Sequence, residues 1–302
     1  MRRISFLVIC FCLLLWAPVA SGAVNLRDVV TFGDSLTDND LLRFYSGSPQ
    51  DLYGRDPMHA VFYKASRSGT QLWKYAVAGS ESDELEVQVD AYEIARLFEL
   101  QDKATLFSIE IGGNDILNNI DQLAAYPPGA SSSVDGVVSN IISNIHRSWR
   151  VLKASHPYAR FVLWTIPDVT LTPSQWSELS EVGAANVRAH IQRANRYIRN
   201  LSSYSSVVVL DLYKIMRQFI ADPPAYFGYQ LIPPPGYGNY DSLFADQIHP
   251  TAVSNAFIAN KIIYLMNTKW QDSIRFYTNR QLAKLAHIPY ETVVILTASG
   301  WE

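Results

Sequence analysis

The stretch Phe32-Gly33-Asp34-Ser35-Leu36-Thr37-Asp38 comes just after a short apolar run, Val29-Val30. It predicts a buried strand that ends at a glycine-bearing turn, with Ser35 at the corner between the strand and a helix near residues 35–45. At such a corner a serine hydroxyl is exposed, and backbone N–H groups point in the same direction. Gly-Asp-Ser is also ordinary turn chemistry. The heptapeptide alone is therefore consistent with a nucleophile and with a plain turn.

A second segment pairs a carboxylate with an imidazole near the C-terminal end, in Asp246-Gln247-Ile248-His249-Pro250-Thr251. On a loop that ends at a proline, Asp246 can accept the Nδ1 proton of His249 and leave Nε2 free as a base. The alternative is a surface ion pair ahead of a helix that begins near residue 251. His59 has Asp56 at the same spacing and is a weaker candidate base.

A third segment is Ile109-Glu110-Ile111-Gly112-Gly113-Asn114-Asp115, where an alternating apolar strand runs into two glycines and an amide. The glycines let the backbone approach a ligand closely, and the Asn114 side-chain amide can donate to a developing oxyanion. Asn114 could also cap a helix or close a turn. Together the three segments contain a nucleophile, an oriented base and an oxyanion donor, which are the parts of an acyl-transfer site.

With these residues in hand, the chain resembles the SGNH or GDSL hydrolase family of esterases and lipases. The resemblance rests on four blocks in the family's order, namely Gly33-Asp34-Ser35-Leu36, Tyr75-Ala76-Val77-Ala78-Gly79-Ser80, Gly112-Gly113-Asn114-Asp115 and the segment from Asp246 to Thr251. It implies that Ser35 is the nucleophile, that His249 is the general base and that Asp246 orients His249.

The same resemblance implies an oxyanion hole formed by the backbone N–H groups of Ser35 and Gly79 and by the side chain of Asn114. The chain departs from the family pattern at Lys74, where the family often has asparagine, and this departure bears on Gly79 alone. Within the family the first and last blocks look most like secreted lipases, lysophospholipases and acyltransferases.

The order of apolar segments predicts a single α/β domain. Expected strands lie at residues 29–30, 72–77, 105–111, 161–166 and 207–210, and expected helices near residues 35–45, 83–100, 137–154, 182–201 and 252–266. Near-continuous apolar strands, each followed by a helix, indicate a parallel sheet covered on both faces, with its site at the carboxyl ends of the strands. A three-layer α/β/α sandwich of this flavodoxin-like kind is also the fold that the resemblance implies. The hydrolase domain is expected over residues 24–268, and residues 269–302 form an extension to which the sequence assigns no role.

The first 23 residues have the layout of a signal peptide. Arg2-Arg3 precedes an apolar stretch at residues 4–16, and Ser21-Gly22-Ala23 provides a small-residue cleavage site, so the mature chain would begin at Val24 in a secreted or periplasmic protein. The apolar stretch is short for a membrane span, which argues against a stable membrane anchor. Loss of the two arginines would change the formal net charge from −3 to −5. A negatively charged protein is a poor match to nucleic acid.

Both cysteines, Cys10 and Cys12, lie inside the predicted leader, so disulfides are not expected in the mature chain. A Gly-x-Ser-x-Gly elbow is absent around Ser35, which argues against the ordinary α/β-hydrolase type of serine esterase. The acidic residues near the four blocks lack a second histidine at ligand spacing, so neither a metal nor another cofactor is expected.

The substrate is predicted from loops rather than from the four blocks. Residues 222–246 are rich in proline and aromatic side chains and form either one wall of an acyl-chain groove or a crossover packed on the sheet edge. An aromatic segment at residues 44–69 is a candidate for the opposite wall. We expect a lipid ester or lysophospholipid as substrate. The alternatives are a carbohydrate acetylesterase with the same site and an inactive secreted protein that binds lipid or glycan.

Overall fold

The computed structural model describes residue 26 and residues 28–38, 50–66, 69–98, 104–289 and 292–293. The predicted signal peptide and most of the helix predicted near residues 35–45 lie outside the described residues. The start of that helix prediction is wrong, because residues 35–37 form a turn. Both Thr37 and Asp38 donate their backbone N–H groups to the carbonyl of Asp34, at 3.1 and 2.8 Å. Ser35 therefore lies in a closed turn directly after the first strand.

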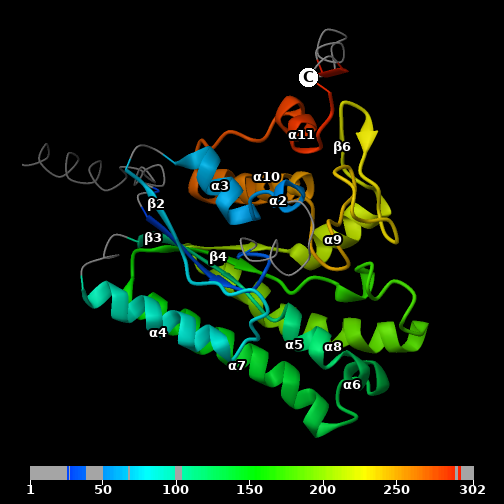
Figure 1. Ribbon diagram of the computed structural model, residues 1–302. Helices are drawn as coiled ribbons and strands as arrows, with labels where there is room; N and C mark the ends of the chain where they lie inside the picture. The colour runs from blue at the N-terminus through cyan, green and yellow to red at the C-terminus, as the bar shows by residue number, and fades with distance from the viewer. Residues whose placement is uncertain are drawn as a thin grey trace, which may run out of the picture.

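The centre of the molecule is a five-stranded parallel sheet (Figure 1). Its strands are β1 (Asp28–Gly33), β2 (Gln71–Lys74), β3 (Ala104–Glu110), β4 (Arg160–Trp164) and β5 (Val207–Leu210), in the spatial order β2-β1-β3-β4-β5. The chain passes from β1 to the edge strand β2 and then returns to place β3 on the other side of β1. The carboxyl ends of β1 and β3 thus border the crevice where connections diverge, the usual ligand site of open parallel sheets.

Helices cover both faces of this sheet, which confirms the predicted three-layer α/β/α sandwich (Figure 1). One face carries α4 (Glu84–Leu97), α5 (Gly113–Asn118), α6 (Ile120–Ala125), α7 (Ser132–Ser155) and α8 (Glu181–Asn200). The other face carries α2 (Gln50–Tyr53), α3 (Pro57–Ala65), α9 (Leu212–Ala221), α10 (Ala252–Trp270) and α11 (Asn279–Leu285). Two short 3-10 helices, η1 (Val169–Leu171) and η2 (Leu201–Ser203), lie in the connections.

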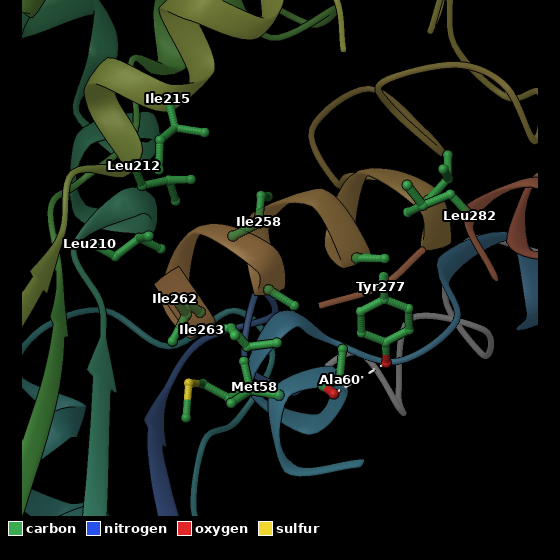
Figure 2. Packing of buried hydrophobic residues seen from close by; sticks show 14 of the residues in the cluster. Met58, Ala60, Leu210, Leu212, Ile215, Ile258, Ile262, Ile263, Tyr277 and Leu282 are labelled. Atoms are coloured by element: carbon green, nitrogen blue, oxygen red, sulfur yellow. Dashed lines mark hydrogen bonds between the residues drawn. The ribbon is translucent and has the colours of Figure 1, made fainter. Parts of the chain in front are cut away.

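Two hydrophobic cores separate the layers, and consecutive strand residues contribute to different cores. Val29 and Leu106 pack in the core under α3 and α10, whereas Val30 and Phe107 pack in the core under α4, α7 and α8. Figure 2 shows the first of these cores, where α10 residues such as Ile262 lie near side chains of α3 and α9. Because side chains alternate across a strand, strands with a core on both faces must be apolar at nearly every position. This explains the continuous apolar runs in the sequence.

Glycine is required where β1 ends. Gly33 has a φ of +144°, and a Cβ there would lie 1.9 Å from the backbone oxygen of Glu110. The register of β1 and β3 pairs the same two residues. The backbones therefore approach too closely for any side chain, and this approach brings the Ser35 turn beside the end of β3.

Several elements differ from the sequence prediction. The strand expected at residues 72–77 ends at Lys74, and the helix expected at residues 137–154 begins earlier, at Ser132. Elements that were not predicted are α2, α3, α5, α6, α9, α11 and a hairpin formed by β6 (Ala225–Tyr226) and β7 (Tyr229–Gln230). These elements are too short to show apolar residues repeating over several turns or strand positions. Several begin at a side-chain cap, as α9 does where Asp211 accepts the Lys214 backbone N–H.

The aromatic loop at residues 222–246 has one part that is buried in a core and another part that lines a cavity. Tyr226 and Phe227 are buried in the core beneath α10 and α11, as expected for a packed crossover. Leu243 and Phe244, close to the Asp246 segment, line an apolar cavity. The described residues contain no helix whose length and hydropathy would suit it to span a bilayer.

Candidate active site

Ser35, His249 and Asp246 form one hydrogen-bonded chain. The hydroxyl Oγ of Ser35 lies 2.8 Å from Nε2 of His249, and Nδ1 of His249 lies 2.7 Å from Oδ2 of Asp246. Ser35 and His249 are 214 residues apart in the chain, so this contact exists only in the folded protein. The geometry is that of a nucleophile, a base and a carboxylate that orients the base.

The Asp246 carboxylate is held by several donors. Its Oδ1 accepts the backbone N–H groups of Ile248 and His249 at 2.8 and 2.7 Å, and its Oδ2 also accepts the Tyr53 hydroxyl at 3.0 Å. Burial alone would raise the pKa of Asp246, but the His249 hydrogen bond and charge, with the backbone donors, lower it below its ordinary value. The carboxylate therefore stays ionised and fixes the tautomer in which Nδ1 carries the proton.

The Ser35 turn is fixed from two sides. Leu36 donates its backbone N–H to Oδ1 of Asp34 at 3.0 Å, which closes the turn around Ser35. Before the turn, the side-chain amide of Gln88 in α4 makes two hydrogen bonds to the backbone of Gly33. Its oxygen accepts the Gly33 N–H at 2.8 Å, and its nitrogen donates to the Gly33 carbonyl at 2.8 Å. The same amide nitrogen also donates to Oγ of Ser80 at 3.2 Å. Gln88 thus joins the turn to the segment that contains Gly79.

The proposed oxyanion donors come from two neighbouring segments. The Asn114 amide lies at the N-terminus of α5 and donates one N–H to the Ser80 carbonyl at 2.9 Å, which joins this segment to that of Gly79. Gly79 has a φ of +89° and open space around its Cα. Since the Asn114 amide has two N–H groups, the second can donate to a substrate oxygen. The structure brings the third block against the second, as the sequence predicted.

A buried acid pair lies under the Ser35 turn. Asp34 and Glu110 are 3% and 1% exposed, and their carboxyl groups influence each other in the interior. Burial raises the pKa of both groups, and the nearby Asp34 charge raises that of Glu110 further, well above its ordinary value. Thr37 adds a long hydroxyl contact of 3.4 Å to Oε2 of Glu110. The pair fastens the turn to β3.

The departure at Lys74 has a structural explanation. Its ammonium lies 2.7 Å from Oδ2 of Asp56, a carboxylate with a side chain only 1% exposed. The other oxygen of Asp56 accepts the backbone N–H of His59 and caps α3. The Asp56–His59 spacing is therefore a helix cap and does not form a second His249-like base. Lys74 stabilises β2 against α3 and leaves Gly79 unobstructed.

An apolar cavity lies next to the loops that carry Ser35 and His249. Its volume is about 70 Å³, and the residues that flank the pair in sequence, Leu36, Ile248 and Pro250, contribute to its lining. Further lining comes from one face of α9, including Met216 and Phe219, and from α10. Thr172 and Ser254 supply the hydroxyl groups among lining residues that are otherwise apolar. A lining of this kind favours an apolar group.

Comparison with known proteins agrees with the site. The family model of the GDSL-like Lipase/Acylhydrolase matches residues 29–262, which include Ser35, Asn114 and His249. The chain belongs to this GDSL family. The GDSL family match ends before the C-terminal segment that contains α11. No curated protein matches the sequence.

Solved structures share the GDSL fold at low sequence identity. A lipase from a goat rumen metagenome is 15% identical, with 79% of this chain and 96% of that chain covered and a TM-score of 0.55. A GDSL-like lipase from Parabacteroides merdae is 14% identical, with 81% and 99% covered and a TM-score of 0.50. An extracellular lipase from Streptomyces rimosus is 17% identical, with 80% and 99% covered and a TM-score of 0.47.

Three residues of this GDSL site were missed in the sequence. Tyr53 and Gln88 carry no motif, because each acts through a hydrogen bond to a residue far along the chain. Glu110 did carry a signal, since a carboxylate within an otherwise buried strand needs a partner. Among the described residues, no group of three histidine, cysteine, aspartate or glutamate side chains is arranged to hold a metal ion.

Proposed function

We propose that this GDSL acylhydrolase cleaves lipid esters through an acyl-enzyme on Ser35. The observation that carries the proposal is the apolar cavity lined by Leu36 and Ile248, the sequence neighbours of the hydrogen-bonded Ser35 and His249. An acyl chain placed in this cavity would bring its carbonyl carbon to the Ser35 hydroxyl. A lysophospholipid or another single-chain ester is the substrate class that matches one narrow cavity.

The reaction follows from the positions of the protons. Nε2 of His249 takes the Ser35 proton as Oγ attacks the ester carbonyl carbon. The negative charge that forms on the carbonyl oxygen is stabilised by the N–H groups of Ser35 and Gly79 and by the Asn114 amide. His249 then gives its proton to the departing alcohol, which leaves the acyl group on Ser35.

The second half-reaction reverses these roles. Water enters, His249 takes its proton, and the hydroxide attacks the acyl carbon. Collapse of the second tetrahedral intermediate returns the proton to Ser35 and releases the carboxylic acid. An acceptor alcohol in place of water would give acyl transfer, as in the acyltransferases that the first and last blocks resemble.

A chain-length series tests the substrate proposal. The purified protein is assayed with p-nitrophenyl acetate, butyrate, octanoate and palmitate, and with lysophosphatidylcholine. We expect activity on the longer esters, no activity in Ser35→Ala, and an acyl adduct on the Ser35 peptide in mass spectra of acid-quenched enzyme. Equal hydrolysis by wild type and Ser35→Ala refutes the mechanism. Activity on p-nitrophenyl acetate alone favours a carbohydrate acetylesterase over a lipid esterase. No activity with any of these esters favours an inactive binding protein.

A variant that fills the cavity separates the acyl-chain proposal from general ester hydrolysis. Met216→Trp replaces a flexible side chain of the cavity lining with a bulkier indole ring. Gln218→Trp, on the exposed side of the same helix, is the matched control. We expect Met216→Trp to lower the ratio of palmitate to acetate activity by roughly tenfold or more, while the control retains the wild-type ratio. Equal ratios in all three proteins contradict the assignment of this cavity to the acyl chain.

Export is part of the same proposal. The support is the predicted leader at residues 1–23, with its two arginines, its apolar stretch and its small-residue exit. Mass spectrometry of the protein recovered outside the cytoplasmic membrane should give an N-terminus at Val24. A recovered chain that still begins at Met1 contradicts it.

A further inference from the structure

Tyr53 is a buried tyrosine that contacts both members of the proposed Asp246–His249 pair. It is 2% exposed, and its hydroxyl donates to Oδ2 of Asp246 at 3.0 Å. The same oxygen lies 2.7 Å from Nδ1 of His249. The Tyr53 ring also meets the imidazole edge-on, with centroids 6.3 Å apart and planes at 73°. Tyr53 therefore restrains the carboxylate that orients the base.

The donors to Asp246 restrain it in complementary ways. The backbone N–H groups of Ile248 and His249 hold Oδ1, but both belong to the loop that carries the carboxylate itself. Tyr53 donates from α2, which is 193 residues away in the chain. It thereby ties the catalytic loop to the helical layer above the sheet. A hydrogen bond to a charged group is among the stronger ones in proteins, so this tie is worth more than an ordinary contact.

The position of Tyr53 depends on the C-terminal part of the chain. Helix α2 has only four residues, too few to be stable without tertiary contacts. The Asn255 side chain of α10 donates to the Tyr53 carbonyl at 3.1 Å. At the other end of α2, Asp51 accepts the Tyr240 hydroxyl at 3.0 Å and lies 3.3 Å from Nε2 of His287.

The segment after α10 adds further contacts to the layer that contains α2 and α3. The His287 ring stacks on Tyr240 with centroids 3.9 Å apart. The side-chain oxygen of Gln281 in α11 accepts a hydrogen bond from the Lys64 ammonium at 2.9 Å. The Tyr277 hydroxyl donates to the Ala60 carbonyl at 3.1 Å (Figure 2). This segment thus braces α2 and α3 from beyond the residues that the family model matches.

We propose that Tyr53 is a positioning residue for the Asp246–His249 pair and that residues 271–289 hold it in place. The inference rests on the proposed function of Ser35, His249 and Asp246. Loss of the Tyr53 hydroxyl frees the carboxylate to rotate and makes it a stronger base. The imidazole is then less often aligned with Ser35, and the imidazolium form is favoured at a given pH.

The variant Tyr53→Phe tests this with readouts that a merely structural role would not change. We expect kcat to fall about tenfold, the size expected for loss of a hydrogen bond to a charged group, with KM within twofold of wild type. The acidic limb of log(kcat/KM) against pH should move to higher pH. The titratable groups that face the pair are Tyr53 from α2 and Asp34 from the turn after β1, and only the first is changed.

The matched control is Tyr158→Phe, which removes a hydroxyl from a 97% exposed tyrosine between α7 and β4 and should leave kcat, KM and the pH profile unchanged. A double-mutant cycle with Asp246→Ala adds a second test, because Tyr53→Phe should have no further effect once the carboxylate is gone. A wild-type kcat and pH profile in Tyr53→Phe, or an equal loss in the Asp246→Ala background, overturns the proposal.

His287→Ala tests the bracing by the C-terminal segment. We expect a smaller fall in kcat, with the acidic limb moved in the same direction as in Tyr53→Phe. A variant that melts at lower temperature yet retains the wild-type kcat and pH profile overturns the bracing role. The proposed function fails separately, because it requires Ser35→Ala to be inactive. An inactive Ser35→Ala beside a fully active Tyr53→Phe refutes the positioning role alone.

Discussion

Replacing Glu110 with glutamine should remove part of the protein's pH sensitivity while leaving its structure in place. The carboxyl groups of Glu110 and Asp34 are buried, burial raises the pKa of both, and the nearby Asp34 charge raises the pKa of Glu110 further. A glutamine has the same shape and can donate its amide N–H to Asp34. Its oxygen can still accept from the Thr37 hydroxyl.

The sign and size of the effect follow from proton linkage. A carboxyl group whose pKa is raised on folding contributes its stability fully below the ordinary value and loses it as the pH rises towards the raised value. The loss is about 1.4 kcal/mol of unfolding free energy for each pH unit crossed, because the unfolded chain has released a proton that the folded chain retains. Glu110→Gln removes this loss for one of the two groups. We expect the unfolding free energy of Glu110→Gln to lie within about 1 kcal/mol of the wild-type value at pH 5. At pH 8 we expect Glu110→Gln to be more stable than wild type.

The measurement is urea unfolding, followed by tryptophan fluorescence at pH 5, 6.5 and 8, for wild type, Glu110→Gln and Glu110→Ala. The alanine variant is the control, because it leaves Asp34 without its carboxyl partner and should be destabilised by about 3 kcal/mol or more. Parallel dependence of the unfolding free energy on pH in wild type and Glu110→Gln would refute the raised pKa of Glu110.

Three further substitutions test other parts of the structure. Gly33→Ala should cost about 3 kcal/mol or more, because its Cβ would lie 1.9 Å from the Glu110 carbonyl oxygen. At roughly 2 °C per kcal/mol for a chain of this size, the melting temperature should fall by about 6 °C, and a value within about 2 °C of wild type would contradict this. Lys74→Met should cost about 3 kcal/mol in chemical unfolding because it removes the cation paired with the buried Asp56, and adding Asp56→Asn should recover most of it. Asn114→Ala should lower kcat by about 10²-fold with a small change in KM if its amide stabilises the oxyanion, and an unchanged kcat in steady-state assays would remove it from that role.

The sequence predicted the architecture because each layer leaves a local pattern. Strands buried on both faces must be apolar at nearly every position, and β5 (Val207–Leu210) was accordingly predicted with its observed bounds. The same applies to two of the site blocks, because Ser35 follows the end of β1 and Asn114 follows the end of β3. His249 was expected beside Ser35 from the Asp246–His249 block, and the structure places the two side chains 2.8 Å apart.

The features that escaped prediction depend on contacts between distant residues. The Tyr53 hydrogen bond to Asp246 and the Lys74 pair with Asp56 leave no periodic signal, because each partner looks ordinary in its own segment. The helix predicted after Ser35 was wrong at its start, because the Asp34 side chain caps a single turn there. Short helices such as α5 and α11 are placed by tertiary contacts, which local propensity does not describe.

The separation of Ser35 and His249 along the chain has a practical consequence. The residues around Pro127 and Gly129 form an exposed connection between the part that supplies the serine and the part that supplies the histidine. Two polypeptides divided at that connection would each hold half of the reactive machinery and be silent alone. Ester turnover would then report their reassembly, so the enzyme offers a split reporter whose signal requires both fragments to dock across the sheet.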